Sequence, residues 1–431
     1  MKHRIDVPYG ERSLGIEVDE ARLAFDLAPA NAEPVADLEE AVCRALREPV
    51  GTAPLRNAFR PGQQVVILGD DQTRLTPTDR IVPALLDEIN AAGIPDENIA
   101  VVIATGTHRA LKNDELAEKY GPAVTDRVPV ANHDCLDGDN LVHFGVTRRG
   151  TDIWVNRQVV EADVRIGVGN IVPHHPTGWS GGAKILLPGV AGRHTTGQMH
   201  LLGASEQQLG KVDTPCRAEM EDFARAVGLG FIINTVLNRD AEVCHVVAGH
   251  FVDAHRQGVR RAEGVLGAPF RQLADLVLAS AYPIDFDLFQ ADKGLFSAAL
   301  SARPGGEIML LSPCYDGVSP THPEAVGLAA LSDERLWRLA RGSGQDDPLS
   351  IAEALYFNTI RREFRATLVT EGIPRDVVEA MGFGYMEPDQ VPDYVQTQMR
   401  KQPALTLGVL RNCVDVLPLY RPTAGDDDGL V

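Results

Sequence analysis

The chain has 431 residues, of which 60 are acidic and 41 basic, giving a formal net charge of −19. This length exceeds the roughly 250–300 residues at which single cores usually divide, so we expect two domains. The acidic excess, without a cluster of Lys or Arg, argues against nucleic acid and anionic membranes as partners. Any anionic substrate must therefore be held by a few local cations.

The cellular location is indicated by the targeting and membrane-spanning features that the sequence lacks. The N-terminal stretch has no apolar core of a signal peptide, and no later run reaches the length of a transmembrane helix. The six cysteines form no C-x-x-C pair, which is typical of reduced thiols. We therefore expect a cytoplasmic protein.

The first half of the sequence alternates strands with a helix. Short apolar runs predict strands at 64–69, 99–104 and 164–168. A helix is expected to begin near 76–79, with a hydroxyl cap and a proline in its first turn, and to end at Gly93. A strand, a helix and a strand of these lengths form a βαβ unit with a parallel sheet. Residues 142–155 resemble a β-hairpin.

The second half repeats this alternation. Strands are expected at 274–279, 307–311, 365–369 and 405–409, and helices at 290–302, 323–341 and 348–363. The sequence thus predicts two α/β domains with mostly parallel sheets. We place the N-terminal domain at 1–268, the C-terminal domain at 269–418 and a flexible tail at 419–431.

Polar residues gather where three strands of the first domain end, at 70–74, 105–109 and 169–175. Ligands bind at the carboxyl ends of strands in parallel α/β sheets, so these clusters can converge on one site. In the second domain a strand leads through 280–283 to a further polar group at 290–293. The natural position for the site is a cleft between the two domains.

Each cluster also has an ordinary structural explanation. Asp71 and Arg74 could pair and cap the next helix, and His108 could be a hydrogen-bonded turn residue. Gln290 and Lys293 are three residues apart on a helix, where solvated polar faces are common. However, separate segments carry Arg, His, His and Lys at strand ends, and this coincidence favours a site.

Familiar motifs do not describe the segment 173–189, PHHPTGWSGGAKILLPG. Lys184 lacks the preceding Gly and the following Ser or Thr of a phosphate loop. The sequence offers no H-E-x-x-H, no G-x-S-x-G around Ser180 and no G-x-G-x-x-G after the first strand, which argues against zinc hydrolases, serine hydrolases and ordinary dinucleotide sites. Adjacent His174 and His175 cannot chelate a metal as an i, i+4 pair, but histidines can act as bases near neutral pH.

Taken together, these stretches resemble the nickel-dependent lactate racemase family of 2-hydroxyacid racemases and epimerases. The resemblance rests on DQTR at 71–74, TGTHR at 105–109, the segment 173–189, His200 after a methionine, and QADK at 290–293. The long central segment with its lysine is the most specific of these. The resemblance implies an isomerase with two α/β domains and an active site between them.

The resemblance also implies a nickel-pincer nucleotide as cofactor. This is a pyridinium mononucleotide derived from nicotinic acid, with two sulfur-bearing groups that hold nickel. Lys184 would carry it covalently through a thioamide link, and Asp71 and Lys293 would contact it. His200 would be the protein ligand to nickel, which suits a metal with soft sulfur donors and one imidazole.

The implied reaction inverts C2 of a 2-hydroxyacid, lactate-like or larger, by hydride transfer to and from the cofactor. Inversion needs a base for either hand of the substrate, and His108 and His174 would be this acid/base pair. Arg74 would clamp the substrate carboxylate, because a guanidinium group binds a carboxylate bidentately. Gln290 would orient the substrate.

Some positions depart from the family pattern. Val172 stands where an acidic residue is common, His175 where an aromatic residue is common, and Phe289 where lactate-specific members often have tyrosine. These departures leave open a longer, aromatic or polyhydroxylated 2-hydroxyacid as substrate. His175 is interpreted as a structural residue.

Two other functions stay open. The same histidines could serve an oxidoreductase with a dissociable nicotinamide or metal cofactor, or the chain could bind or carry the pincer cofactor without catalysis. The partners implied are a small 2-hydroxyacid substrate and the enzymes that synthesise the cofactor, and a homo-oligomer is possible.

Overall fold

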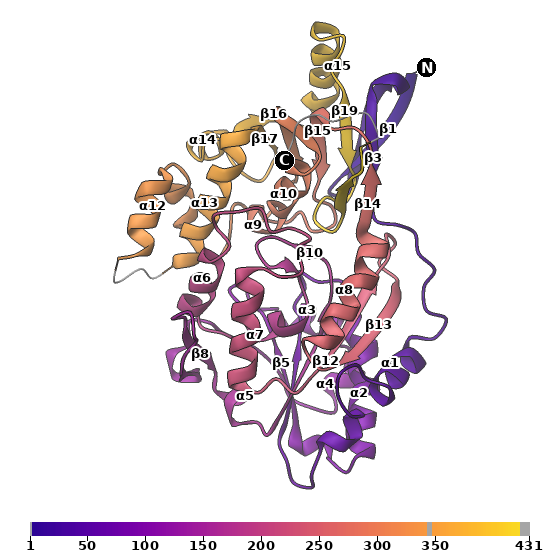
Figure 1. The fold of residues 1–431 in the computed structure, drawn as a ribbon, viewed down its shortest axis with the longest axis vertical. Helices are drawn as coiled ribbons and strands as arrows, with labels where there is room; N and C mark the ends of the chain where they lie inside the picture. The colour runs from indigo at the N-terminus through magenta and orange to yellow at the C-terminus, as the bar shows by residue number, and fades with distance from the viewer. Residues whose placement is uncertain (1, 343–346, 423–431) are drawn as a thin grey trace.

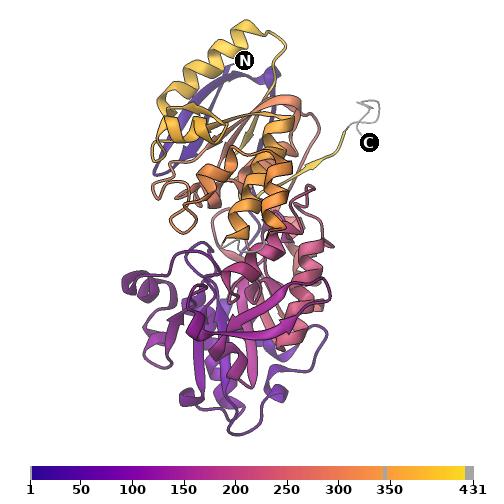
Figure 2. The same cartoon turned by 90° about the vertical axis from the view of Figure 1, so that its left-hand side faces the viewer.

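The computed structural model describes residues 2–342 and 347–422. The chain forms two lobes, each built around a six-stranded sheet (Figures 1 and 2). The first lobe, at the bottom of Figure 1, contains most of the indigo-to-pink part of the chain, and the second lobe contains the orange and yellow part together with the indigo N-terminal strands. The predicted fold class, two α/β domains with mostly parallel sheets, is confirmed.

The first sheet carries the predicted strands of the N-terminal half. From edge to edge its strands are β13 (Val243–Gly249), β12 (Phe231–Leu237), β9 (Val164–Asn170), β4 (Val65–Gly69), β5 (Ile99–Ile103) and β6 (Val130–Asn132). Neighbouring strands are parallel from β12 to β6, whereas β13 runs antiparallel to β12. The predicted hairpin is also present, as β7 (Leu141–Val146) and β8 (Asp152–Asn156).

Both faces of this sheet are buried. Val65 and Ile67 pack in one core with Leu85 of the helix that follows β4, whereas Val66 and Leu68 pack in a second core on the other face. Side chains alternate between the two faces of a strand, so a strand covered on both faces is apolar throughout. This is why β4 and β5 were recognisable in the sequence as uninterrupted apolar runs.

Helix α2 (Thr78–Ala91) connects β4 to β5 and completes the predicted βαβ unit. It begins within the expected stretch 76–79, but without the expected hydroxyl cap. Thr76 does not cap it, because its hydroxyl group donates instead to the Asp70 carboxylate at 2.5 Å, and the N-cap residue Pro77 makes no side-chain hydrogen bond to the helix. The other α-helices between β3 (Leu23–Leu27) and β15 (Ala274–Ser280) are α1 (Leu38–Arg47), α3 (Asn113–Tyr120), α4 (Pro122–Thr125), α5 (Arg157–Glu161), α6 (Arg193–Leu201), α7 (Pro215–Val227) and α8 (Asp253–Leu266).

The order of the strands indicates where a ligand would bind in the first lobe. β5 and β6 lie on one side of β4, whereas β9 and β12 lie on the other side. The chain therefore changes direction across the sheet between β4 and β9. In open α/β sheets ligands bind beside the carboxyl ends of the strands at such a switch point.

The second sheet is parallel throughout. Its strands are β18 (Gly384–Met386), β17 (Arg365–Val369), β16 (Ala302–Leu311), β15 (Ala274–Ser280), β19 (Leu407–Leu410) and β3 (Leu23–Leu27). The four strands predicted in the C-terminal half correspond to β15, β16, β17 and β19, and the predicted helix at 348–363 is α13 (Pro348–Glu363).

Two predicted helices of the second lobe are interrupted. The helix expected at 290–302 is divided at Asp292 into α9 (Leu288–Ala291) and α10 (Lys293–Ala299). The helix expected at 323–341 is α11 (Ala325–Ala329) followed by α12 (Asp333–Ala340), because Ser332 adopts an extended backbone as the N-cap of α12. Serine favours this position.

The N-terminal residues join the second lobe, although the predicted boundary assigned them to the first. β3 pairs with β19 at the edge of the second sheet. The hairpin of β1 (Lys2–Tyr9) and β2 (Arg12–Asp19) covers one face of that sheet together with α15 (Val391–Lys401) (Figure 1). The alternating apolar side chains of the hairpin pack there against Leu276 and Leu278. Sequence order alone therefore misplaced residues 2–27, and the division near 268 stays a prediction.

The predicted tail at 419–431 begins in an ordered element. Leu419 and Tyr420 belong to β20 (Leu417–Tyr420), which pairs with β14 (Gly267–Phe270), whereas 423–431 lie outside the described residues.

The remaining α-helix of the described residues is α14 (Arg375–Ala380). Within the described ranges no helix has both the length and the apolar character needed to cross a bilayer. All six cysteines are free thiols.

Candidate active site

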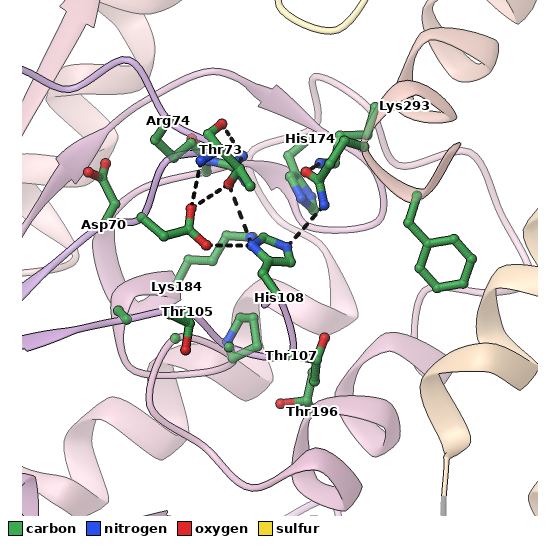
Figure 3. A pocket seen from close by; sticks show the side chains of 18 of the residues that line it. Asp70, Thr73, Arg74, Thr105, Thr107, His108, His174, Lys184, Thr196 and Lys293 are labelled. Atoms are coloured by element: carbon green, nitrogen blue, oxygen red, sulfur yellow. Dashed lines mark hydrogen bonds and ion pairs between the residues drawn. The ribbon is translucent and has the colours of Figure 1, made fainter. Parts of the chain in front are cut away.

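The residues selected from the sequence line one cavity between the two lobes. Its empty volume is about 1280 Å³, part of which is open to solvent. Figure 3 shows His108 near the centre of this cavity, with Arg74, His174, Lys184 and Lys293 around it. The full set of predicted site residues found in its lining is Asp71, Arg74, His108, His174, Lys184, His200, Gln290 and Lys293.

His108 and Asp71 form a charge-assisted pair. β4 and β5 are neighbours, and the segments after them bring His108 Nδ1 to 2.7 Å from Asp71 Oδ2. The other oxygen, Asp71 Oδ1, accepts hydrogen bonds from the backbone N–H and the hydroxyl group of Thr73, at 3.0 and 2.6 Å. Although burial opposes it, the charge and hydrogen bond of His108 hold the pKa of Asp71 below its usual range. An ionised carboxylate only accepts, so the His108 proton lies on Nδ1.

Gln290 extends this arrangement across the cleft. The backbone N–H of Gln290 donates to Asp287 at 2.8 Å, which caps α9 and holds the side chain in the cavity. Lys293 Nζ donates to Gln290 Oε1 at 2.6 Å, so the Gln290 amide group must donate to His108 Nε2, which is 3.2 Å away. Nε2 therefore carries a lone pair, in agreement with the proton position set by Asp71. Burial and the charge of Arg74 lower the pKa of Lys293 to about 8.

His174 offers a second lone pair to the cavity. It ends β10 (Pro173–His174), which pairs with β11 (Gly178–Trp179). The Thr177 hydroxyl group donates to the Trp179 carbonyl at 2.9 Å and must accept from His174 Nδ1 at 3.2 Å, since a hydroxyl group has one hydrogen. His174 Nε2 is then unprotonated. Burial and the charges of Lys184 and Lys293 lower the pKa of His174 well below its usual value.

Lys184 follows a tight glycine turn. Gly181 and Gly182 have φ values of +73° and +61°, and a Cβ atom on Gly182 would lie 2.9 Å from the His255 ring. Lys184 Nζ has no hydrogen-bond or ion-pair partner among the described residues. Burial and the charges of Arg74 and Lys293 lower the pKa of Lys184 well below its usual value, which favours the neutral, nucleophilic form of its amine.

His200 lies on α6 with one ring nitrogen engaged. Its Nδ1 is 2.8 Å from the carbonyl oxygen of Thr196, to which it can only donate. Nε2 is thus left as the nitrogen available to a metal, and the backbone acceptor orients the ring in the way that buried metal-binding histidines require. Burial lowers the pKa of His200 to about 3, so the imidazole is neutral.

Arg74 brings a cation to the cavity, where no carboxylate of the described residues lies within ion-pair distance of it. One guanidinium nitrogen donates to the carbonyl and hydroxyl oxygens of Thr73, at 2.9 and 3.1 Å. Within the described part of the chain, the guanidinium group forms no ion pair. A substrate carboxylate is the kind of group that would complete this arrangement.

The sequence did not reveal the wall that the second lobe adds to the cavity. This wall contains His322, Asp292, Glu353 and Tyr356, with Thr196 of α6 next to it. Asp292 stands within the quoted QADK stretch and could have been selected, whereas an isolated histidine and one glutamate on a long helix carry no motif. His175, interpreted as structural, stacks on Phe296 with ring centroids 3.7 Å apart.

Comparison with known proteins agrees with this geometry. Residues 9–210 match the family model of the lactate racemase N-terminal domain. Lactate racemases of Lactiplantibacillus plantarum and Thermoanaerobacterium thermosaccharolyticum are 30% and 29% identical over 321 residues, covering 73% of this chain and 75% of each relative. The structure of the lactate racemase apoprotein from the latter organism matches with a TM-score of 0.84 at 25% identity, over 97% of this chain and 100% of that chain. The chain therefore belongs to the lactate racemase family.

Proposed function

We propose that this protein is a racemase or epimerase that inverts C2 of a 2-hydroxyacid with a nickel-pincer nucleotide as cofactor. One observation carries the proposal: His108 and His174 both hold their proton on Nδ1, so that two Nε2 lone pairs share a cavity with the guanidinium group of Arg74, which has no ion pair among the described residues. Inversion without preference for one hand needs two such bases. Membership of the lactate racemase family supports the same reaction class.

The residues present fit the cofactor. A lysine that becomes linked through its nitrogen must offer a neutral amine, and burial lowers the pKa of Lys184 in that direction. His200 would supply one imidazole to nickel through Nε2. The described residues hold no group of three or more His, Cys, Asp or Glu side chains arranged for a metal, and the proposed cofactor asks for only one protein ligand. When bound, the cofactor supplies a group that accepts a hydride and returns it.

The protein residues then bind the substrate and move its proton. Arg74 binds the carboxylate, and His108 or His174 takes the hydroxyl proton at Nε2 while the C2 hydrogen leaves as a hydride. Asp71 stabilises the imidazolium form of His108 by its charge. Only a neutral hydroxyl group supports His174, so we infer that His174 is the weaker base. Correct positioning of these groups can lower a barrier by roughly 7–11 kcal/mol.

A carrier of the cofactor would need Lys184 and His200 but not the oriented pair of His108 and Asp71. An oxidoreductase with a dissociable cofactor would not need an unpaired lysine in the cavity. The presence of both features favours the racemase over these alternatives. The enzymes that synthesise the cofactor are the partners that this proposal requires.

The test is to express the protein together with cofactor-synthesis enzymes and to follow two signals. Intact-protein mass spectrometry should show an adduct that Lys184→Ala lacks, and a panel of chiral 2-hydroxyacids should include one that loses optical purity. An adduct without turnover of any acid would support a carrier. An unmodified chain that binds a nicotinamide dinucleotide would support the oxidoreductase.

A further inference from the structure

A buried arginine binds the segment that carries both His174 and Lys184. Arg217 lies in the first turn of α7 and is only 1% exposed. Its Nη1 donates to the carbonyl oxygen of Gly181 at 3.0 Å, and its Nη2 donates to the carbonyl oxygen of Trp179. The guanidinium group therefore joins two points of the backbone between the histidine and the lysine.

These two carbonyl groups lead to the two proposed functional side chains. The Trp179 carbonyl also accepts from the Thr177 hydroxyl group at 2.9 Å, and this is the hydroxyl group that supports His174 Nδ1. The Gly181 carbonyl also accepts from the backbone N–H of Lys184 at 3.3 Å. One side chain thus supports the proposed base and the proposed attachment residue, whose side chains share the cavity (Figure 3).

The helix and the surroundings of Arg217 do not explain its charge. It is the third residue of α7, where the partial positive charge of a helix N-terminus disfavours a cation. It forms no ion pair among the described residues, and its Nε has no hydrogen-bond partner in them. Burial lowers the pKa of Arg217 to about 9, although the charge of Glu221 opposes this change. A buried charge without an ion-pair partner destabilises a folded protein, so the two carbonyl groups are what account for the arginine.

The same turn is held from other elements as well. His255 Nε2 of α8 lies 2.9 Å from the carbonyl oxygen of Ser180, to which it can only donate. The backbone N–H of Gly182 donates to Asn234 Oδ1 of β12 at 2.9 Å. The carbonyl groups of 179, 180 and 181 therefore all accept from buried side chains. The protein itself fixes the conformation of this turn.

We infer that Arg217 is a positioning residue, which sets the place of the Lys184 amine relative to the His174 ring. This inference rests on the proposed function, in which Lys184 carries the cofactor and His174 is one of the two bases. Such placement matters, because an error of about 1 Å can slow a reaction roughly a hundredfold. A neutral apolar side chain would fill the same space without donating to either carbonyl group.

The first test uses the apoprotein and needs no cofactor. Hydrogen exchange followed by mass spectrometry compares the amide groups of 179–189 with those of α7. In Arg217→Leu the amide groups of the turn should exchange about tenfold to a hundredfold faster, which is the effect of losing a hydrogen bond to a charged group. The amide groups of α7 should keep their wild-type exchange. Equal loss of protection in α7 and the turn would show a merely structural arginine and overturn the inference.

Two further variants make this test specific. Arg217→Lys keeps the charge and one donor group, so its exchange in the turn should lie between those of wild type and Arg217→Leu. Arg225→Leu removes an exposed arginine from the same helix and should leave the turn unchanged. Thermal unfolding of each variant checks the fold, and if Arg217→Leu does not fold, the comparison of Arg217→Lys with wild type decides.

The second test uses protein made together with cofactor-synthesis enzymes. Intact mass gives the fraction of chains with the adduct, which should fall in Arg217→Leu. Per loaded chain, kcat should fall roughly tenfold to a hundredfold with little change in KM, because the misplaced groups are the base and the cofactor rather than the carboxylate clamp Arg74. Arg217→Lys should recover part of both losses, and Arg225→Leu should match wild type.

The two proposals fail in different ways. If Arg217→Leu keeps wild-type exchange in the turn, or if its loaded chains keep the wild-type kcat, Arg217 is not a positioning residue and the racemase stands. If exchange in the turn rises as expected but wild type gains no adduct and inverts no acid, the support of the turn by Arg217 stands and the proposed function is refuted.

Discussion

Asp71 Oδ2 lies 2.7 Å from His108 Nδ1, and this contact joins the loops that follow the neighbouring strands β4 and β5. It fixes which nitrogen of His108 carries the proton, and Gln290 approaches the other nitrogen from the second lobe at 3.2 Å. The site is therefore complete only when the two lobes are assembled.

Asp71→Asn should impair the chemical step. The asparagine amide has no charge to stabilise the His108 imidazolium form, and its NH₂ group can turn the ring to the wrong tautomer. We expect kcat to fall roughly 10²–10⁴-fold, the range for loss of acid–base catalysis, with a small change in KM. Steady-state kinetics measure both values. A fall confined to KM would instead assign Asp71 to substrate binding.

Arg74→Gln should chiefly weaken substrate binding. Losing charge-assisted hydrogen bonds costs roughly 1.5–3 kcal/mol, so KM for the hydroxyacid should rise about tenfold to a hundredfold. Arg80→Gln, on the exposed side of α2, is the control for loss of one positive charge from the surface. Unchanged saturation in Arg74→Gln would remove Arg74 from the substrate site.

Substrate binding should weaken at alkaline pH because the cavity loses the positive charge of Lys293, which also holds Gln290 in place. Burial and the Arg74 charge lower the pKa of Lys293 to about 8 in the structure. A lysine is cationic below its pKa and neutral above it, so KM for the anionic substrate should rise as pH increases through about 8. Arginine stays charged throughout this range, and Lys293→Arg should move the rise to higher pH. A wild-type KM that is constant between about pH 7 and pH 9 would contradict this role.

Lys184→Met should separate stability from function. The wild-type side chain is partly buried, and its amine lines the cavity without a hydrogen-bond or ion-pair partner among the described residues, so methionine, which has a similar length, can replace it without loss of packing. We expect the free energy of unfolding of the apoprotein to change by no more than about 0.5 kcal/mol while the adduct and activity disappear. Denaturant unfolding measures the first effect and intact mass the second, with the exposed Lys401→Met as control. A destabilised Lys184→Met variant would show that the lysine is part of the folded framework.

The first sheet and its polar edge were predictable because of how parallel strands are buried. β4 and β5 are covered on both faces and read as apolar runs, and the carboxyl ends of adjacent parallel strands meet at one edge. Asp71 and His108 could therefore be expected to lie close together. The resemblance to a family added Lys184 and His200, whose unpaired amine and oriented ring no strand pattern indicates.

Other features depend on packing that sequence order does not specify. The alternating pattern of β1 and β2 indicates a half-buried hairpin but not which sheet it covers, and the structure places it on the second. Glu353 has the sequence context of a solvated helix residue until α13 packs against α6. His322 is held in the cavity wall by Asp347, which caps α13 and is 25 residues away in the sequence.

The central claim is that the C2 hydrogen leaves as a hydride and returns to the opposite face of the same carbon, while His108 or His174 holds the hydroxyl proton. The most direct measurement is to incubate the cofactor-loaded protein with one enantiomer of a 2-hydroxyacid in D₂O and to follow optical purity and deuterium at C2 together. We predict loss of optical purity with the original hydrogen retained at C2. Deuterium at C2 in step with inversion, or no loss of optical purity for any acid, would contradict the account.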